Sequence, residues 1–197
     1  MRNPLSRGGF LFGGEMRLFA GIRLSEEISR NLFEMGTALS RKIREARPVP
    51  PENLHLTLRF IGEVEEERVG RITDVLSESC RNFEPFVLSV KGTGVFPDRK
   101  RMRIFWAGAD SGGILRRMNS RMEKGLEAIG FPAGERFKEH ITVARFRSVP
   151  SITAAEFFLE KYGGTVFGSM NVEKVDIIRS ILSGGSPVYE TLEAVLL

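Results

Sequence analysis

Hydrophobic and polar residues alternate along several short segments of this 197-residue chain. The clearest is segment 54–61. There the apolar residues Leu54, Leu56, Leu58 and Phe60 occupy every second position, and three of the four residues that follow them are polar. A two-residue period is typical of a strand with one buried face. We expect further strands at residues 17–24, 86–95, 102–109, 140–146, 172–182 and 188–196.

Four other segments carry apolar residues at helical spacing. The first begins after Ser25, a residue suited to capping a helix, with Glu26 and Glu27 in the first turn. It is expected to run to about Ala46, before the Pro48, Pro50, Pro51 cluster. Three more helices are expected at 65–80, 115–129 and 153–162. Because neighbouring strands near 86–109 and 166–196 can pair as hairpins, the fold class predicted is α+β with mostly antiparallel sheets.

Composition narrows the functional classes only slightly. Hydrophobic residues make up 42% and charged residues 27%, as in ordinary globular proteins. The single Cys80 excludes an intrachain disulfide and fits a cytoplasmic location, and no apolar run is long enough to cross a membrane. A net charge of +4 favours a polyanionic partner without identifying one, and the most basic segment is 97–103.

The first 15 residues look separate from the fold. Their apolar stretch is too short and too interrupted by Gly for a signal peptide. We therefore expect residues 1–15 to form a flexible extension, with Met16 a candidate for the natural start, and residues 16–197 to form a single domain.

The two histidines of the chain occur in matching surroundings. His55 and His140 each precede a threonine by two residues, Thr57 and Thr142, and an aliphatic residue follows each His and each Thr. Residues i and i+2 of a strand project from the same face. Each His-x-Thr motif therefore presents an imidazole beside a hydroxyl, with the aliphatic side chains packed behind.

This set of groups suits the opening of a cyclic phosphodiester. An imidazole with a pKa near 6.5 can serve as a base when neutral and as an acid when protonated, and threonine hydroxyls can donate to phosphate oxygens. A half-buried histidine bonded to its own Thr or to a backbone carbonyl is the structural alternative, but the duplication favours catalysis. A two-histidine metal site would need a carboxylate, and Glu139 should point to the opposite face.

The chain resembles the two-histidine phosphoesterase superfamily, in particular the RNA 2′,3′-cyclic phosphodiesterases, also described as 2′–5′ RNA ligases. The matching segments are 16–24, 51–64, 94–97 followed by 103–108, and 137–146, with a weaker match at 183–189. The resemblance implies a bilobal fold, in which two mostly antiparallel sheets with outer helices are related by a pseudo-twofold axis around a cleft that holds both motifs.

The resemblance also implies an activity and a set of roles. The activity is hydrolysis of a 2′,3′-cyclic phosphate to a 2′-phosphate without a metal or nucleotide cofactor, acting on RNA ends or small cyclic nucleotides. His55 would protonate the leaving 3′-oxygen, His140 would activate water, and Thr57 and Thr142 would hold the phosphate. A monomer is expected.

The chain departs from the usual family sequence at two places near the site, and the roles of two arginines are not decided by the sequence. Glu139 stands where the family commonly has Pro, and residues 179–182 read RSIL where a Glu-Ser pair is usual. The resemblance makes Arg145 a phosphate ligand, although simple alternation places it opposite His140 unless a bulge intervenes. Arg59 is an even number of residues from His55 and so lies on the same face of an ideal strand. It is the phosphate ligand that spacing alone supports. A solvated strand-end arginine is the alternative for both.

Other functions stay open at the level of sequence. A non-catalytic RNA-binding protein could use the cleft and the basic segment 91–103. The same chemistry could also act on the cyclic phosphate of ADP-ribose or on a 2′–5′ linked oligonucleotide. Ligation would be the reverse reaction through the same site.

Overall fold

The computed structural model describes residues 15–183 and 186–197, except for the side chains of residues 183 and 186. Nearly all of the expected N-terminal extension, and part of the 183–189 match, lie outside the described residues. The strands are β1 (Met16–Arg23), β2 (Ala46–Pro48), β3 (His55–Val64), β4 (Phe86–Phe96), β5 (Ile104–Asp110), β6 (His140–Phe146), β7 (Val166–Val172), β8 (Lys174–Ser183) and β9 (Ser186–Leu196). The α-helices are α1 (Glu26–Lys42), α2 (Val69–Cys80), α3 (Ile114–Ala128) and α4 (Ile152–Tyr162), and Pro51–Asn53 and Glu66–Arg68 form short 3₁₀ turns.

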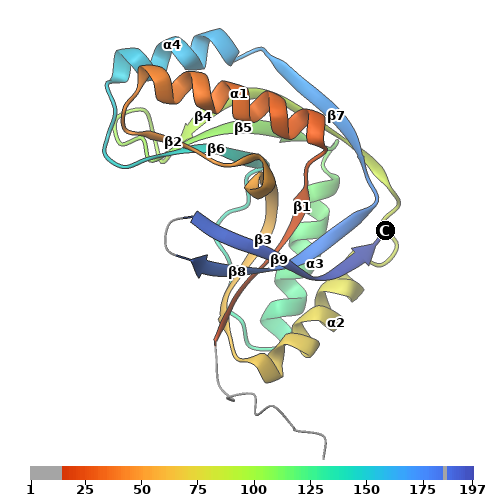
Figure 1. The fold of residues 1–197 in the computed structure, drawn as a ribbon. Coiled ribbons are helices and arrows are strands. Elements are labelled where there is room, and N and C mark those ends of the chain that lie inside the picture. Colours follow the sequence, from red (N-terminus) through yellow and green to blue (C-terminus); the bar gives the residue numbers. More distant parts are fainter. Residues whose placement is uncertain (1–14, 184–185) are drawn as a thin grey trace, which may run out of the picture.

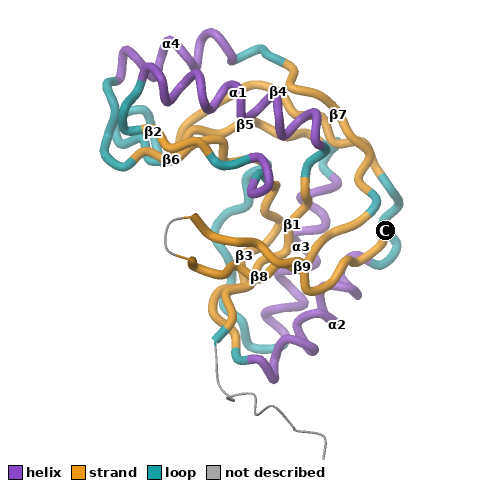
Figure 2. The backbone as a smooth tube through the Cα atoms, viewed as in Figure 1, coloured by secondary structure: helices purple, strands orange, loops and turns teal. Residues whose placement is uncertain are grey.

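The strands form one curled antiparallel sheet in the order β7-β4-β5-β6-β3-β1-β8-β9, with β2 pairing on β6. The sequence predicts two sheets, and the structure joins the two halves at a single residue pair, Leu56 of β3 with Ile141 of β6. Figures 1 and 2 show the sheet bending sharply at this junction. The expected bilobal α+β fold is confirmed, with the two lobes sharing one continuous sheet.

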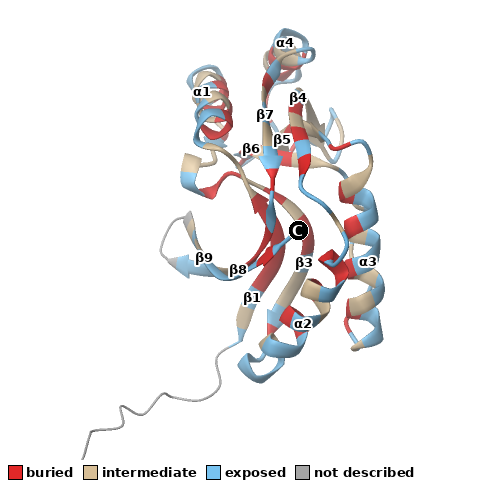
Figure 3. Ribbon diagram, turned by 90° about the vertical axis from the view of Figure 1, so that its right-hand side faces the viewer, coloured by how far each residue is buried: buried red, intermediate tan, exposed pale blue. Residues whose placement is uncertain are grey.

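Each lobe carries its own pair of helices. Helices α1 and α4 contact strands β4, β6 and β7, and helices α2 and α3 contact β9 and β3 (Figure 1). We call these halves the His140 lobe (β2, β4 to β7, α1, α4) and the His55 lobe (β1, β3, β8, β9, α2, α3). Figure 3 shows buried residues on the strands and on the sides of the helices that face them.

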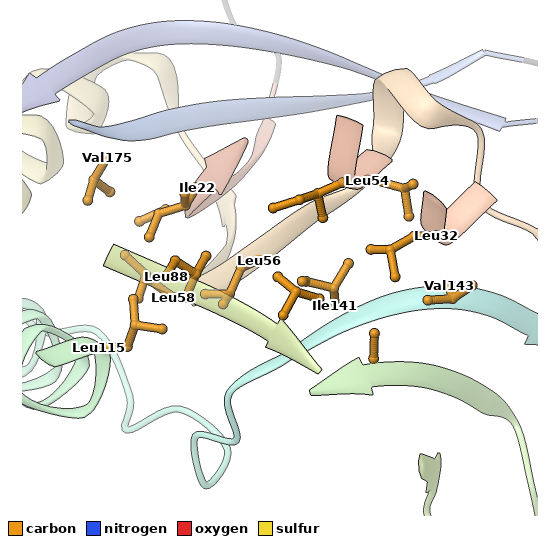
Figure 4. Close-up of a cluster of buried hydrophobic side chains, with 14 of the residues drawn as sticks. Ile22, Leu32, Leu54, Leu56, Leu58, Leu88, Leu115, Ile141, Val143 and Val175 are labelled. Atoms are coloured by element: carbon orange, nitrogen blue, oxygen red, sulfur yellow. The ribbon is translucent and has the colours of Figure 1, made fainter. Parts of the chain in front are cut away.

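The core runs continuously through the junction between the lobes. Leu56 and Ile141 are both fully buried and lie in one apolar cluster with Leu58, Val143 and Leu32 (Figure 4). Because these aliphatic side chains fill the convex side of the sheet, the side chains between them must project into the concave side. The aliphatic positions of both His-x-Thr motifs therefore fix which way the polar positions face.

Most predicted elements are confirmed, and the differences have local causes. The cap of α1 forms as expected, with the Ile28 N–H donating to the Ser25 hydroxyl. Helix α1 ends at Lys42 rather than near Ala46, because residues 46–48 pair with β6 as strand β2, which the sequence pattern did not predict. Strand β7 is separate from β8. In the described part of the chain, none of the helices has the length and apolarity required to cross a membrane.

Candidate active site

His55 is the first residue of β3 and is held by the backbone that precedes it. Its Nδ1 lies 2.7 Å from the carbonyl oxygen of Asn53. A carbonyl can only accept, so Nδ1 carries the proton and, in the neutral ring, Nε2 is left as an acceptor. The ring also contacts Phe19 at a centroid distance of 4.7 Å and the edge of Tyr189 at 5.0 Å.

His140 is the first residue of β6 and repeats this arrangement. Its Nδ1 lies 2.7 Å from the carbonyl oxygen of Lys138, two residues earlier. The ring meets Phe96 edge-on at 4.8 Å and lies 6.5 Å from Trp106. The two imidazoles therefore share one tautomer, one type of anchor and an aromatic setting, as expected for two copies of the same local structure.

The junction of the lobes brings the two motifs together. Leu56 is paired with Ile141 in an antiparallel arrangement. Extending that register by one residue on either side sets His55 opposite Thr142 and Thr57 opposite His140. This register brings both histidines and both threonines to one junction, and the sequence expectation of two imidazoles and two hydroxyls around one cleft has a geometric basis.

Burial and nearby positive charge keep both imidazoles neutral at pH 7. Burial lowers the pKa of His55 to about 4 against the raising effect of the bond to the Asn53 carbonyl, and the charges of Arg23, Arg145 and His140 lower it further. Burial also lowers the pKa of His140, with help from Arg145 and Lys138. The guanidinium of Arg145 thus acts on both rings, which places it within electrostatic reach of the whole site.

Both strands carry a β-bulge immediately after the His-x-Thr motif. In β3, Thr57 pairs with Gly21 and Arg59 with Ala20, which leaves Leu58 as the extra residue. In β6, Thr142 pairs with Trp106 and Ala144 with Phe105, which leaves Val143 as the extra residue. A bulge inserts one residue and so reverses the alternation of faces beyond it. The first residue after each motif that returns to the cleft is therefore five positions beyond the histidine.

Arg59 does not lie in the cleft, which corrects the placement that alternation suggested. Because of the bulge at Leu58, its side chain passes to the convex side, where it is 7% exposed. There it forms an ion pair with Glu123 at 2.8 Å and donates to the carbonyl oxygens of Phe60 and Pro132. Phe60 takes the cleft-facing position and is 56% exposed.

Arg145 faces the cleft because of a β-bulge, the irregularity that residue counting along the strand required to place it there. The bulge at Val143 returns the position five residues after His140 to the concave face, and Arg145 is exposed there. Phe60 and Arg145 are therefore equivalent positions of the two lobes. One lobe offers the cleft an aromatic ring at this position, and the other offers a cation.

Glu139 turns away from His140, as its parity predicts. Its Oε2 accepts two hydrogen bonds from Arg116 of α3 at 2.9 and 3.1 Å. The other departure, RSIL at 179–182, contains Arg179, which forms an ion pair with Glu190 across the β8–β9 pair at 3.8 Å. Within residues 15–183 and 186–197, no three His, Cys, Asp or Glu side chains gather as a metal site.

Sequence reasoning missed two residues beside His55. Asn53 is 8% exposed, and its side-chain amide donates to the carbonyl oxygen of Pro187 at 2.8 Å, while its own carbonyl holds the imidazole. Tyr189, from the start of β9, contacts both His55 and Phe19. Asn53 lies in the matched segment 51–64 and Tyr189 ends the weaker match at 183–189, but neither match indicated that these side chains border His55.

An α+β fold with one curled sheet, in which two strands that each carry a His-x-Thr motif meet at the junction of two lobes, is the fold of a two-histidine phosphoesterase. Residues 22–106 match the family model described as LigT like Phosphoesterase. An Archaeoglobus fulgidus protein named RNA 2′,3′-cyclic phosphodiesterase is 35% identical over 178 residues, which cover 90% of this chain and 98% of the relative. A crystal structure from Thermus thermophilus matches with a TM-score of 0.75 at 33% identity, covering 92% of this chain and 98% of that one.

A more distant structure agrees in fold. E. coli LigT complexed with 3′-AMP superposes with a TM-score of 0.73 at 23% identity, covering 93% of this chain and 98% of that one. The Archaeoglobus fulgidus relative, 35% identical over nearly its whole length, shows that this chain belongs to the LigT-like phosphoesterase family.

Proposed function

We propose that this protein hydrolyses the 2′,3′-cyclic phosphate ends of RNA to 2′-phosphates. The observation that carries the proposal is the pairing of two His-x-Thr strands at one junction, with both imidazoles held through Nδ1 at 2.7 Å. Relatives that share most of their length with this chain bear the name RNA 2′,3′-cyclic phosphodiesterase. Membership of the family and the geometry of the site support the same reaction.

The roles of the residues follow from the tautomer and the resemblance. The Nε2 of neutral His140 takes a proton from water as the water oxygen attacks phosphorus. The bond between phosphorus and the ribose 3′-oxygen breaks, and His55 delivers its proton to that oxygen. The products are a 2′-phosphate and a free 3′-hydroxyl. Thr57, Thr142 and Arg145 stabilise the charge that grows on the non-bridging oxygens.

The lowered pKa of His55 constrains this mechanism. A proton donor must be protonated, and His55, with a pKa of about 4, is neutral at pH 7. A phosphate anion bound between the rings favours the imidazolium and raises the pKa again. We therefore expect proton uptake on substrate binding. Because kcat/KM reports the free enzyme, it should fall as pH rises above about 4, whereas the fall of kcat, which reports the complex, should lie at higher pH.

A product assay tests the proposal. The protein is incubated with 2′,3′-cyclic mononucleotides and with RNA bearing a cyclic end, and the position of the remaining phosphate is determined. A 2′-phosphate supports the assigned roles. A 3′-phosphate would mean that the other ribose oxygen leaves, and no hydrolysis of either substrate would refute the proposed activity.

Two alternatives have distinct outcomes in the same assay. A non-catalytic RNA-binding protein would bind RNA in a salt-dependent way without hydrolysing any cyclic phosphate. An enzyme for ADP-ribose cyclic phosphate would hydrolyse that compound and leave RNA ends intact. Ligation of RNA ends held side by side is the reverse reaction and would be a secondary activity of the same histidines.

The cellular setting belongs to the same proposal. We infer a cytoplasmic monomer, since the single cysteine, Cys80, forms no intrachain disulfide and is buried, which fits a reducing compartment and leaves no exposed thiol to link two copies. Light scattering at micromolar concentration tests the monomer, and a mass near 44 kDa, about twice the chain's 22.1 kDa, would contradict it.

A further inference from the structure

A row of cations leaves the site along β6. Beyond the bulge, Arg145 faces the cleft, and Phe146, the last residue of β6, is buried on the other side. Arg147 follows the end of the strand and is exposed, and its N–H donates to the Glu45 carbonyl oxygen beside β2 at 3.0 Å, so the pairing with the β2 side continues and we extend the alternation to Arg147. Strand β2 adds a third cation, because Arg47 is the cross-strand partner of Arg145 and so shares its face. We call Arg47, Arg145 and Arg147 the basic stripe.

The basic stripe gathers three arginines that have no ion-pair partner among the described residues, as is also the case for isolated exposed arginines such as Arg30 and Arg71. Within the described part of the chain, no carboxylate lies within ion-pair distance of its three guanidinium groups, whereas Arg59, Arg116 and Arg179 each pair with a glutamate. The side chain of Arg47 donates only to the carbonyl oxygens of Arg44 and Ala46. Like charges held together without partners repel one another, so the stripe is suited to an external polyanion.

The opposite wall has apolar character. Tyr189 of β9 touches His55, and Pro187, two residues earlier, lies on the same face of the strand. Leu182 of β8 is the cross-strand partner of Pro187 and is 76% exposed. We call Leu182, Pro187 and Tyr189 the apolar stripe. It leads away from His55 as the basic stripe leads away from the region of His140.

Both stripes run to the same side of the molecule. In Figure 1 the free ends of the β8–β9 pair and the ends of β2 and β6 all lie on the left, below and above the opening between the lobes. Arg147 is seven residues beyond His140, which corresponds to about 20 Å along a strand. That length exceeds a single nucleotide and matches a short stretch of nucleic acid chain.

We propose that the two stripes form a track for the single-stranded RNA that precedes the cyclic end. Its phosphates lie against Arg47 and Arg147, and its bases lie against Leu182 and Pro187. The chemistry of the two walls matches the two sides of a single strand, one anionic and one apolar. This inference rests on the proposed function and deepens it, since it makes an RNA chain a better substrate than a cyclic mononucleotide.

The test compares two substrates in two matched variants. The Arg47→Ala/Arg147→Ala double variant removes the outer cations and leaves Arg145 in place. The control, Arg30→Ala/Arg71→Ala, removes the same charge from exposed helical arginines of α1 and α2. Each protein is assayed on a 2′,3′-cyclic mononucleotide and on an eight-nucleotide RNA with a cyclic end, over a range of salt concentrations.

The track predicts a substrate-specific loss. In the Arg47/Arg147 variant, kcat/KM for RNA should fall about tenfold, and the slope of its logarithm against the logarithm of salt concentration should decrease by about 1.4, for two lost phosphate contacts. Hydrolysis of the mononucleotide should stay within about twofold. Leu182→Ser should raise KM for RNA about threefold without changing the salt slope, because it removes an uncharged contact.

Three results would overturn the track. These are an equal loss on both substrates, an equal loss in the control variant, and no loss in either. Binding of the eight-nucleotide RNA with a 2′-phosphate end is measured in parallel by fluorescence anisotropy. If the wild-type protein hydrolyses nothing but its RNA binding still depends on Arg47 and Arg147, the proposed function fails while the track stands.

Discussion

The regions around His55 and His140 show how one local structure can serve two purposes. Both histidines begin a strand, bond through Nδ1 to a carbonyl two residues earlier and are followed by a bulge. Beyond the bulges they differ, with an exposed Phe60 in one lobe and Arg145 in the other. The repeated part provides two equivalent imidazoles. The part that differs provides the charge and the apolar surface that make the cleft asymmetric.

The anchors of the two rings differ as well. Asn53, which holds His55, is buried and bonds to β9 through its side chain. Lys138, which holds His140, is exposed, and its ammonium group lies 5.0 Å from the centre of the Phe96 ring. The His55 anchor is therefore fixed by tertiary contacts, and the His140 anchor belongs to the segment that leads into β6. Five predictions test how far the two halves are equivalent.

The largest effect is expected from the imidazoles themselves. His55→Ala and His140→Ala should each lower kcat/KM by about 10²–10⁴, because each removes one proton-transfer group. Steady-state kinetics on a cyclic mononucleotide measures the loss, and circular dichroism checks the fold. Near-normal turnover in either variant would disprove the paired acid–base assignment.

Substitution of Arg145 should affect activity, whereas substitution of Arg59 should affect stability. Arg145→Ala should lower kcat/KM about 100-fold and leave the free energy of unfolding nearly unchanged, since the side chain is exposed. Removing its charge should raise the pKa of both histidines, which moves the fall of kcat/KM to higher pH.

Arg59→Ala should show the opposite pattern. It breaks a largely buried ion pair with Glu123 and should reduce the free energy of unfolding by about 3 kcal/mol, measured by urea denaturation. The activity of the folded fraction should change little. A selective loss of activity with normal stability would instead return Arg59 to the phosphate site.

The buried His55 should make stability sensitive to acid. Its pKa is about 4 in the folded protein and 6.5 in the unfolded chain, so the unfolded state binds the extra proton as pH falls from 6.5 to 4. About 3 kcal/mol of the free energy of unfolding should be lost over that range, and none above pH 7. Urea titrations of the wild type and of His55→Gln at pH 7 and pH 4 give the difference. Equal pH dependence in both proteins would contradict the lowered pKa.

The smallest effect is expected at the anchors. Asn53→Ala keeps the carbonyl that holds His55 but loses the bond to Pro187, so kcat should fall about tenfold. Lys138→Ala also keeps its carbonyl, and its exposed side chain has no comparable bond, so kcat should change less than twofold. Equal losses in the two variants would show that the two anchors are held alike.

The elements and the pairing of the two His-x-Thr motifs could be predicted from local sequence. The alternation at 54–61 and 140–146 is so regular that β6 has the predicted bounds and β3 lies within a residue or two of its predicted start. The resemblance correctly gave the two-lobed α+β fold. Strand β2 was missed because three residues carry no measurable period, and their extended form depends on pairing with β6.

The two arginines show where parity reasoning stops. Counting residues along ideal strands placed Arg59 in the cleft and Arg145 outside it, and the bulges at Leu58 and Val143 reverse both placements. Nothing in the letters of either motif marks an extra residue. A bulge forms where the fit of one strand to its neighbour and the packing behind it favour an extra residue. Neither of these contacts can be read from the sequence of a single segment.

The sequence by itself thus determined that two identical motifs exist, which strands carry them and which face their aliphatic residues must bury. Only the tertiary structure decided that the two motifs meet at Leu56 and Ile141, that Arg145 and not Arg59 faces the cleft, and that Asn53 and Tyr189 border His55. The physical reason is range. Side-chain period and burial act between neighbours in the chain, whereas register and bulges depend on pairings between residues distant in the chain, from Gly21 with Thr57, 36 positions apart, to Leu56 with Ile141, 85 positions apart.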